Sequence, residues 1–168
     1  MHRLFRQGYH LELFPLRRSE TNSKKSDTYN DYAASHREKN SKDFQLAVSK
    51  QHSLDEGAEL QVDHYYRPPS PNFPTIDSLL LIRPDRNLPP ILLMFQITLN
   101  QEEHDVKEVG LCAIDRLKLP PDTRRYYVAV TPRGIEPRIK VLKGRFSEVG
   151  VFHHPVHPDR LFPKSAGR

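Results

Sequence analysis

The chain has one cysteine and no tryptophan among its 168 residues, and it has only seven glycines against fifteen prolines. A single cysteine, Cys112, excludes an intramolecular disulfide and fits a reducing compartment. The proline excess indicates stiff loops. Residues 1–16 hold no apolar run long enough for a signal peptide, and no stretch approaches the length of a membrane span. We therefore expect a soluble intracellular protein, nuclear or cytoplasmic, with no membrane partner.

Charge is distributed unevenly around a net value of +5. Residues 1–50 hold ten Lys and Arg against six Asp and Glu, and residues 121–168 hold ten against four. Residues 51–120 hold six against eleven, so the apolar centre is acidic and both flanks are basic. Carboxylates inside a basic frame suit a metal site that faces a polyanion. A solvated surface that binds nothing specific explains the same pattern.

Composition divides the chain into four parts. Residues 1–16 end in a short alternating strand, and residues 17–43 have almost no large aliphatic side chains, which predicts a disordered insertion. Residues 44–142 carry the apolar runs of an α/β core, and residues 143–168 read as a basic irregular tail.

The core begins with three strands. Residues 60–66 alternate apolar and polar side chains up to Pro68, which predicts a half-buried strand. The apolar runs at 75–83 and 91–99 are bounded by prolines and form a hairpin, and the second is apolar on both faces, as in a central strand. Helical spacing follows from about Glu102 to Lys118, and 125–131 reads as a final strand.

This order predicts an α/β fold: a mixed sheet of four to five strands with one packed helix, in the order strand, strand, strand, helix, strand. Within it, Asp77 lies in the first hairpin strand, and Gln96 and Thr98 lie two apart on one face of the second. Oxygen ligands on adjacent strands are what a divalent cation needs to polarise a phosphate. The alternative is that Asp77 caps a turn or is exposed at a strand end.

The segments NFPTIDSLL, LLMFQITL, HDVKEVGL and RYYVAVTP occur in that order between Tyr65 and Pro132. Together they resemble the nuclease-like domain of fungal and oomycete Crinkler and retrotransposon-hotspot-type proteins, a divergent PD-(D/E)XK, or restriction-endonuclease-like, fold. RQGYHLELFPL near the N-terminus is similar to the strand that follows the family's first helix. The resemblance implies that this helix, and the acid it usually carries, would lie before Met1.

The resemblance also implies roles for individual residues. Asp77 would be the metal-binding acid, holding Mg²⁺, and Gln96 and Thr98 would stand where better-known members have Glu and Lys. Lys107 would stabilise negative charge, although Asp105 replaces a proline of the family's motif after His104. The substitutes for the missing acid would be Glu12, Glu56 and Glu59.

Basic residues near the last strand are the candidates for nucleic-acid binding, with a solvated surface as the alternative. They are Arg124, Arg125, Arg133, Arg138, Lys140 and Lys143. His153, His154 and His157 are dense enough to suggest a metal site, but Pro155 and Pro158 prevent a helical arrangement, and chance enrichment explains them better.

The sequence therefore predicts a divergent nuclease-like module that engages DNA or RNA, with weak or absent Mg²⁺-dependent phosphodiester hydrolysis. The alternative is a non-catalytic protein-interaction module or a truncated effector remnant. A nuclease would place Asp77, Gln96 and Thr98 in one open cleft with Lys107 nearby, whereas a scaffold would bury them or turn Asp77 away.

Overall fold

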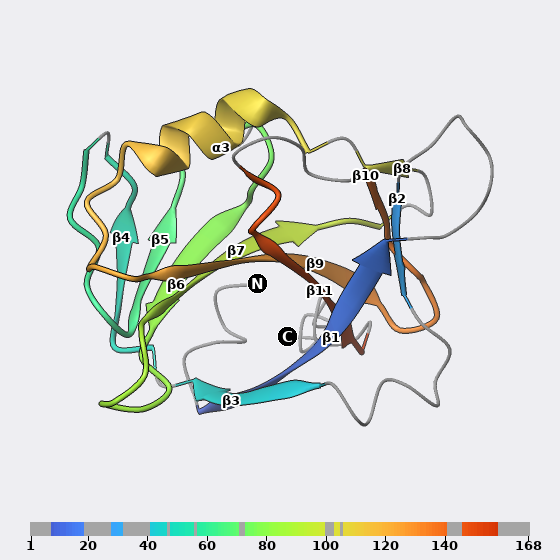
Figure 1. Ribbon diagram of the computed structural model, residues 1–168, viewed down its shortest axis with the longest axis horizontal. Helices are drawn as coiled ribbons and strands as arrows, with labels where there is room; N and C mark the ends of the chain where they lie inside the picture. The colour runs from blue at the N-terminus through green and yellow to red at the C-terminus, as the bar shows by residue number, and fades with distance from the viewer. Residues whose placement is uncertain are drawn as a thin grey trace, which may run out of the picture.

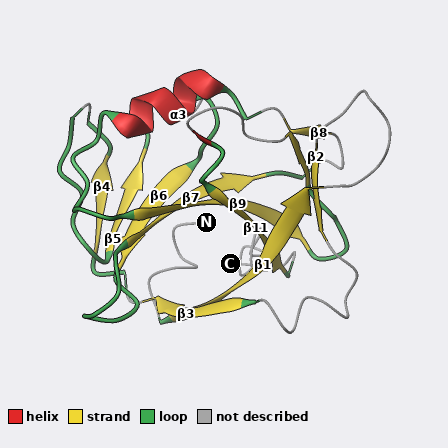
Figure 2. Ribbon diagram, viewed as in Figure 1, coloured by secondary structure: helices red, strands yellow, loops and turns green. Residues whose placement is uncertain are grey.

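The structure is a computed structural model that describes residues 8–18, 28–31, 41–46, 48–55, 57–70, 73–99, 103–104, 106–140 and 146–157. These residues form eleven strands and one helix (Figure 2). Their bounds are β1 Tyr9–Arg18, β2 Thr28–Asp31, β3 Lys42–Leu46, β4 Lys50–Ser53, β5 His64–Arg67, β6 Ser78–Ile82, β7 Ile91–Ile97, β8 Glu103–His104, α3 Glu108–Asp115, β9 Arg124–Pro132, β10 Arg138–Lys140 and β11 Gly150–Val156.

The described strands join in one mixed sheet. Its order is β4-β5-β6-β7-β9-β11-β1-β2-β10-β8, and β3 pairs with β1 away from this path. The strands from β5 to β7 run antiparallel, whereas β7, β9 and β11 are parallel neighbours. The sheet curls, so that α3 covers one face while β1 and β3 come round the other (Figure 1).

The predicted fold class is therefore wrong. Instead of a mixed sheet of four to five strands with one packed helix, the structure has eleven strands in a curled sheet and a helix of only eight residues. The additional strands come mostly from the two basic flanks, where the strand predicted at the end of residues 1–16 is present as β1 but its partners were not predicted. Their hydrogen bonds are to strands far away in sequence, and this pairing has no local signature.

The strands predicted over 75–83 and 91–99 are present as β6 and β7, and each is explained by burial on both faces. On one face of β7, Leu92 and Met94 belong to a core with Leu111 of α3. On the other face, Leu93 belongs to a second core with Leu11 of β1. Because each fully buried aliphatic side chain contributes about 1.5–3 kcal/mol, a strand of this composition is stable only between two apolar layers.

The helix is shorter than the predicted span of about 102–118. Residues 103–104 pair with β10 instead, and α3 begins after Lys107, whose φ of −71° and ψ of 123° are extended. Gly110 lies so close to the chain before β6 that a Cβ there would be 2.1 Å from the carbonyl oxygen of Pro74. The start of α3 thus packs against the segment that precedes Asp77. No helix among the described residues is long and apolar enough to cross a membrane.

The flanks also differ from their predicted character. The segment predicted as a disordered insertion, 17–43, contains β2 and the ends of β1 and β3. The predicted irregular tail, 143–168, contains β11, which lies between β9 and β1 and is buried along most of its length. A strand that lies between two neighbours can form without a long apolar run, because both neighbours provide backbone hydrogen-bond partners.

Candidate functional site

The parallel strands β7, β9 and β11 end together on one side of the sheet, which we call the carboxyl edge. Ile97 is in register with Val130, and Pro132 is in register with Val156. The carboxyl ends of parallel strands are where ligands commonly bind in α/β sheets, because the loops that follow them diverge there. The residues predicted to carry chemistry are best located relative to this edge.

Asp77 lies at the carboxyl edge, directly before β6, and its side chain is exposed. Its backbone N–H donates to the carbonyl oxygen of Phe95 at 2.8 Å. Its carboxylate Oδ2 accepts from the backbone N–H of Ile97 at 2.6 Å. The carboxylate therefore satisfies a backbone donor of β7 where β6 has not yet begun, which gives Asp77 a structural role at a strand end.

Gln96 and Thr98 lie next to Asp77 but contribute little free polar surface. The hydroxyl of buried Tyr127 donates to Oε1 of Gln96, which is half-buried. Burial, and secondly the negative charge of Asp77, raise the pKa of Tyr127 well above its ordinary value, so this hydroxyl keeps its proton. Thr98 is buried, and its N–H donates to Val130 at 3.0 Å.

Lys107 is exposed at the start of α3 and is tied to the same region. The hydroxyl of Thr75 donates to the carbonyl oxygen of Lys107 at 2.7 Å, and Thr75 is two residues before Asp77. The structure thus brings Asp77, Gln96, Thr98 and Lys107 to one edge. Of these four residues, Asp77 and Lys107 have exposed side chains, whereas Gln96 is half-buried and Thr98 is buried. His104 lies in β8, in a part of the chain where only the backbone is described.

These residues offer a bound Mg²⁺ a single carboxylate, that of Asp77. Protein-bound Mg²⁺ is usually held by one or two carboxylates together with substrate phosphates. Here one carboxylate is present, with Oδ2 already hydrogen-bonded, and the amide oxygen of Gln96 accepts from Tyr127. In the described ranges, no three His, Cys, Asp or Glu side chains form a group that could hold a metal ion. Mg²⁺ binding stays a prediction, and we attribute no reaction step to this ion.

Of the proposed substitutes for a second acid, Glu12 and Glu59 lie on other segments than Asp77. Glu12 belongs to β1, and Glu59 is exposed in an isolated bridge to Lys118. Glu56 is outside the described residues.

The predicted basic patch is divided between the two ends of β9. Arg124 and Arg125 begin the strand, and the guanidinium of Arg125 forms an ion pair with Asp115. Arg133 follows the other end and is exposed at the carboxyl edge. Because β9 has nine residues, these ends lie about 26 Å apart. Arg138 and Lys140 lie in β10, where only the backbone is described, and Lys143 is outside the described residues.

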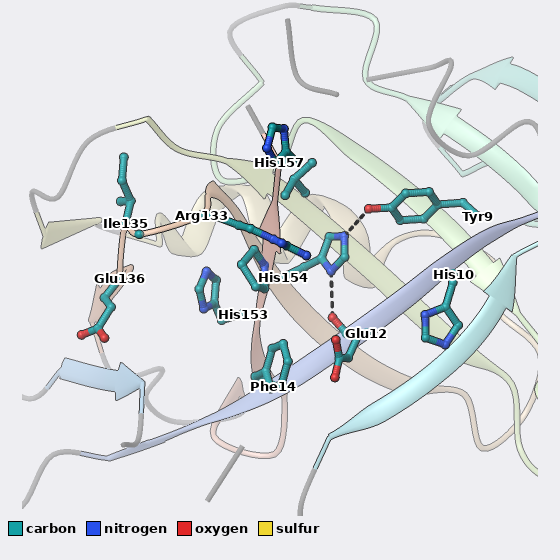
Figure 3. Close-up of a pocket in the computed structure, with 13 residues that line it drawn as sticks. Tyr9, His10, Glu12, Phe14, Arg133, Ile135, Glu136, His153, His154 and His157 are labelled. Atoms are coloured by element: carbon teal, nitrogen blue, oxygen red, sulfur yellow. Dashed lines mark hydrogen bonds between the residues drawn. The ribbon is translucent and has the colours of Figure 1, made fainter. Parts of the chain in front are cut away.

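A cavity of about 780 Å³ opens at the carboxyl edge between β1, β11 and the turn after β9 (Figure 3). Its charged side chains are one cation, Arg133, and two acids, Glu12 and Glu136. Rings supply much of the rest of the lining: Tyr9, His10, Phe14, His153, His154 and His157. The cavity therefore combines flat surfaces for stacking with polar groups of both signs.

His154 is the most constrained of these rings (Figure 3). Its Nδ1 lies 2.7 Å from the carbonyl oxygen of Glu12, which can only accept, so Nδ1 carries the proton. The hydroxyl of Tyr9 then donates to Nε2 at 2.7 Å. Burial lowers the pKa of His154 to about 4, and the nearby charges of His10 and Arg133 act in the same direction. His154 is thus neutral at pH 7 and holds Tyr9 in place.

His153 points to the other side of β11. The hydroxyl of Thr131 donates to the carbonyl oxygen of Ile135 at 2.7 Å and so accepts from Nε2 of His153 at 2.8 Å. His153 is therefore hydrogen-bonded to the turn after β9, through Thr131, and His154 is hydrogen-bonded to the start of β1. From sequence alone, chance enrichment explained these histidines better than a metal site did. The apolar residues around them, Val151, Phe152 and Val156, were the available signal for a strand.

No protein-family model, curated protein or solved structure matches this chain. The resemblance to Crinkler-type nuclease-like domains accordingly stays a prediction.

Proposed function

We propose that the chain is a nucleic-acid-binding module that engages a single-stranded segment at the carboxyl edge and does not hydrolyse it. The observation that carries this proposal is the ring-lined cavity, which has Arg133 in its lining and lies at the same edge as Asp77 and Lys107. The net charge of +5 favours association with a polyanion.

The lining of the cavity offers what an unstacked nucleotide needs. A base can stack on the half-buried ring of Tyr9 or the exposed ring of His10, and base–aromatic stacking contributes about 1–3 kcal/mol per base. Arg133 offers a planar group with several donors to a phosphate. The carboxylates of Glu12 and Glu136 can accept hydrogen bonds from exocyclic amino groups of bases. The two acids also disfavour a duplex, which would bring more phosphates close to them.

Binding without hydrolysis follows from the state of the four predicted catalytic residues. Hydrolysis of the metal-dependent kind needs a firmly held cation and an activated water. The region offers one exposed carboxylate, which is hydrogen-bonded to Ile97, and one exposed lysine, Lys107. A cation and hydrogen-bond donors are sufficient to bind phosphate. We assign that role to Lys107 near Asp77 and to Arg133 in the cavity.

The test is fluorescence anisotropy of labelled single-stranded DNA and RNA with the full chain in EDTA, at several salt concentrations. Binding should weaken with salt. Arg133→Gln should weaken it further and lower the salt slope by about one phosphate contact. The matched control is Arg83→Gln, because Arg83 is exposed in the β6–β7 turn at the opposite end of β7.

The same samples, incubated with Mg²⁺ or Mn²⁺, should leave the oligonucleotides intact. Cleavage that is lost in Asp77→Ala would contradict the non-hydrolysing part of the proposal. Absence of binding by well-folded protein, or an equal loss of affinity in Arg133→Gln and Arg83→Gln, would contradict the assignment of the carboxyl edge.

A further inference from the structure

Two histidines lie side by side on β4, which is the first strand in the order of the sheet, and on its neighbour β5. The strands that line the cavity, β11 and β1, come several strands later in this order. Lys50 is in register with His64, and His52 is in register with Tyr66. Nε2 of His52 and Nδ1 of His64 are 3.0 Å apart. The ring planes differ by only 13°, and their centroids are 4.9 Å apart. His52 is exposed, so solvent reaches the pair.

The pair shares one proton. A hydrogen bond between two imidazole nitrogens uses one N–H and one lone pair, so one ring donates and the other accepts. Burial lowers the pKa of His64, and the charges of His52 and Lys50 add to this, while Asp63 opposes it. In a neutral imidazole the proton can move from one ring nitrogen to the other. If the donating ring carries its proton on the nitrogen that faces away from the partner ring, the two facing nitrogens both present lone pairs.

We propose that His52 and His64 form a chelating site for a late first-row divalent cation with tetragonal geometry, Cu²⁺ above all. With metal–nitrogen bonds of about 2.05 Å, a nitrogen separation of 3.0 Å sets an angle of about 94° at the metal. This is close to the right angle between neighbouring ligands in a tetragonal site and smaller than the tetrahedral angle. Water completes the coordination, because none of the described strands pairs with the outer side of β4.

The surroundings hold one of the two rings in position. His52 stacks on Tyr66 with centroids 5.4 Å apart and planes 25° apart. Tyr66 is buried, and its hydroxyl oxygen accepts from the backbone N–H of Gln61 at 2.8 Å. A ligand ring that is already ordered loses less entropy when the metal binds. This distinguishes the pair from histidines that are close only by chance.

The test is calorimetric titration of the full chain with CuSO₄, followed by electron paramagnetic resonance of the complex. His52→Ala and His64→Ala should each remove one equivalent of Cu²⁺, or weaken it at least tenfold, and should remove the signature of two imidazole nitrogens. His10→Ala is the matched control, because His10 is also an exposed strand histidine, near Asp43, and should keep the site. Unchanged stoichiometry and spectra in His52→Ala and His64→Ala would overturn the proposal.

Discussion

The Nδ1–H of His154 donates a hydrogen bond to the carbonyl oxygen of Glu12 and thereby joins β11 to β1 through a side chain. Phe14 is paired with His153 across these antiparallel strands, and continuing that register places Glu12 opposite Pro155. Proline has no N–H to donate. The side chain of His154 thus supplies the donor that the backbone of Pro155 lacks, and it does so at the cavity proposed to bind nucleic acid.

Removing this donor should destabilise the fold. His154→Phe keeps a ring but leaves the Glu12 carbonyl and the Tyr9 hydroxyl without their partner, and should lower the free energy of unfolding by about 2–3 kcal/mol. Tyr9→Phe removes only the second bond and should cost about 1 kcal/mol. Urea denaturation measures both. Equal stability of His154→Phe and the unsubstituted chain would contradict the role assigned to His154.

Stability should also depend on pH through His154. Its pKa is about 4 in the folded protein against 6.5 for the free side chain. The unfolded state binds the proton more tightly than the folded state does. The contribution of neutral His154 to the free energy of unfolding is therefore complete above pH 6.5 and is lost as the pH falls towards 4. The loss should reach about 3 kcal/mol. Unfolding measured from pH 7 to pH 4 should show this decrease, and the difference between the unsubstituted chain and His154→Phe isolates it from other histidines.

Gly110 should not tolerate a side chain. A Cβ would meet the carbonyl oxygen of Pro74 at 2.1 Å and the side chain of Thr75 at 2.8 Å, so α3 would have to move away from the sheet. Gly110→Ala should lower the free energy of unfolding by about 1–3 kcal/mol, despite the higher helix propensity of alanine. Val109→Ala is the control, because Val109 is 63 % exposed, and should change stability by less than about 0.5 kcal/mol. A neutral or stabilising Gly110→Ala would contradict the close contact.

Asp77 should behave as a structural residue. Asp77→Asn retains an oxygen that can accept from the N–H of Ile97, so its stability should match that of the unsubstituted chain. Asp77→Ala loses the acceptor and should cost about 1 kcal/mol. Thermal or urea unfolding separates the two variants. If both lost the same amount, the negative charge rather than the hydrogen bond would be what Asp77 contributes.

Local sequence was sufficient for the central strands. The runs that became β6 and β7 are apolar on both faces and bounded by prolines, and 125–131 falls within β9. Burial of such runs is favourable in almost any compact arrangement, so their existence did not depend on the partners. The convergence of Asp77, Gln96 and Thr98 followed from the same hairpin.

The partners of the other strands, and with them the cavity, were decided only by tertiary structure. β11 became a buried strand because β9 and β1 lie on its two sides, although its sequence contains two histidines and Pro155. His154 and Tyr9 are 145 positions apart in the chain, and no local pattern connects them. The sequence by itself determined that the apolar runs of β6, β7 and β9 must be buried, since apolar surface avoids water wherever it lies. Only the folded sheet decided which polar groups meet, because a hydrogen bond requires two particular atoms in one place.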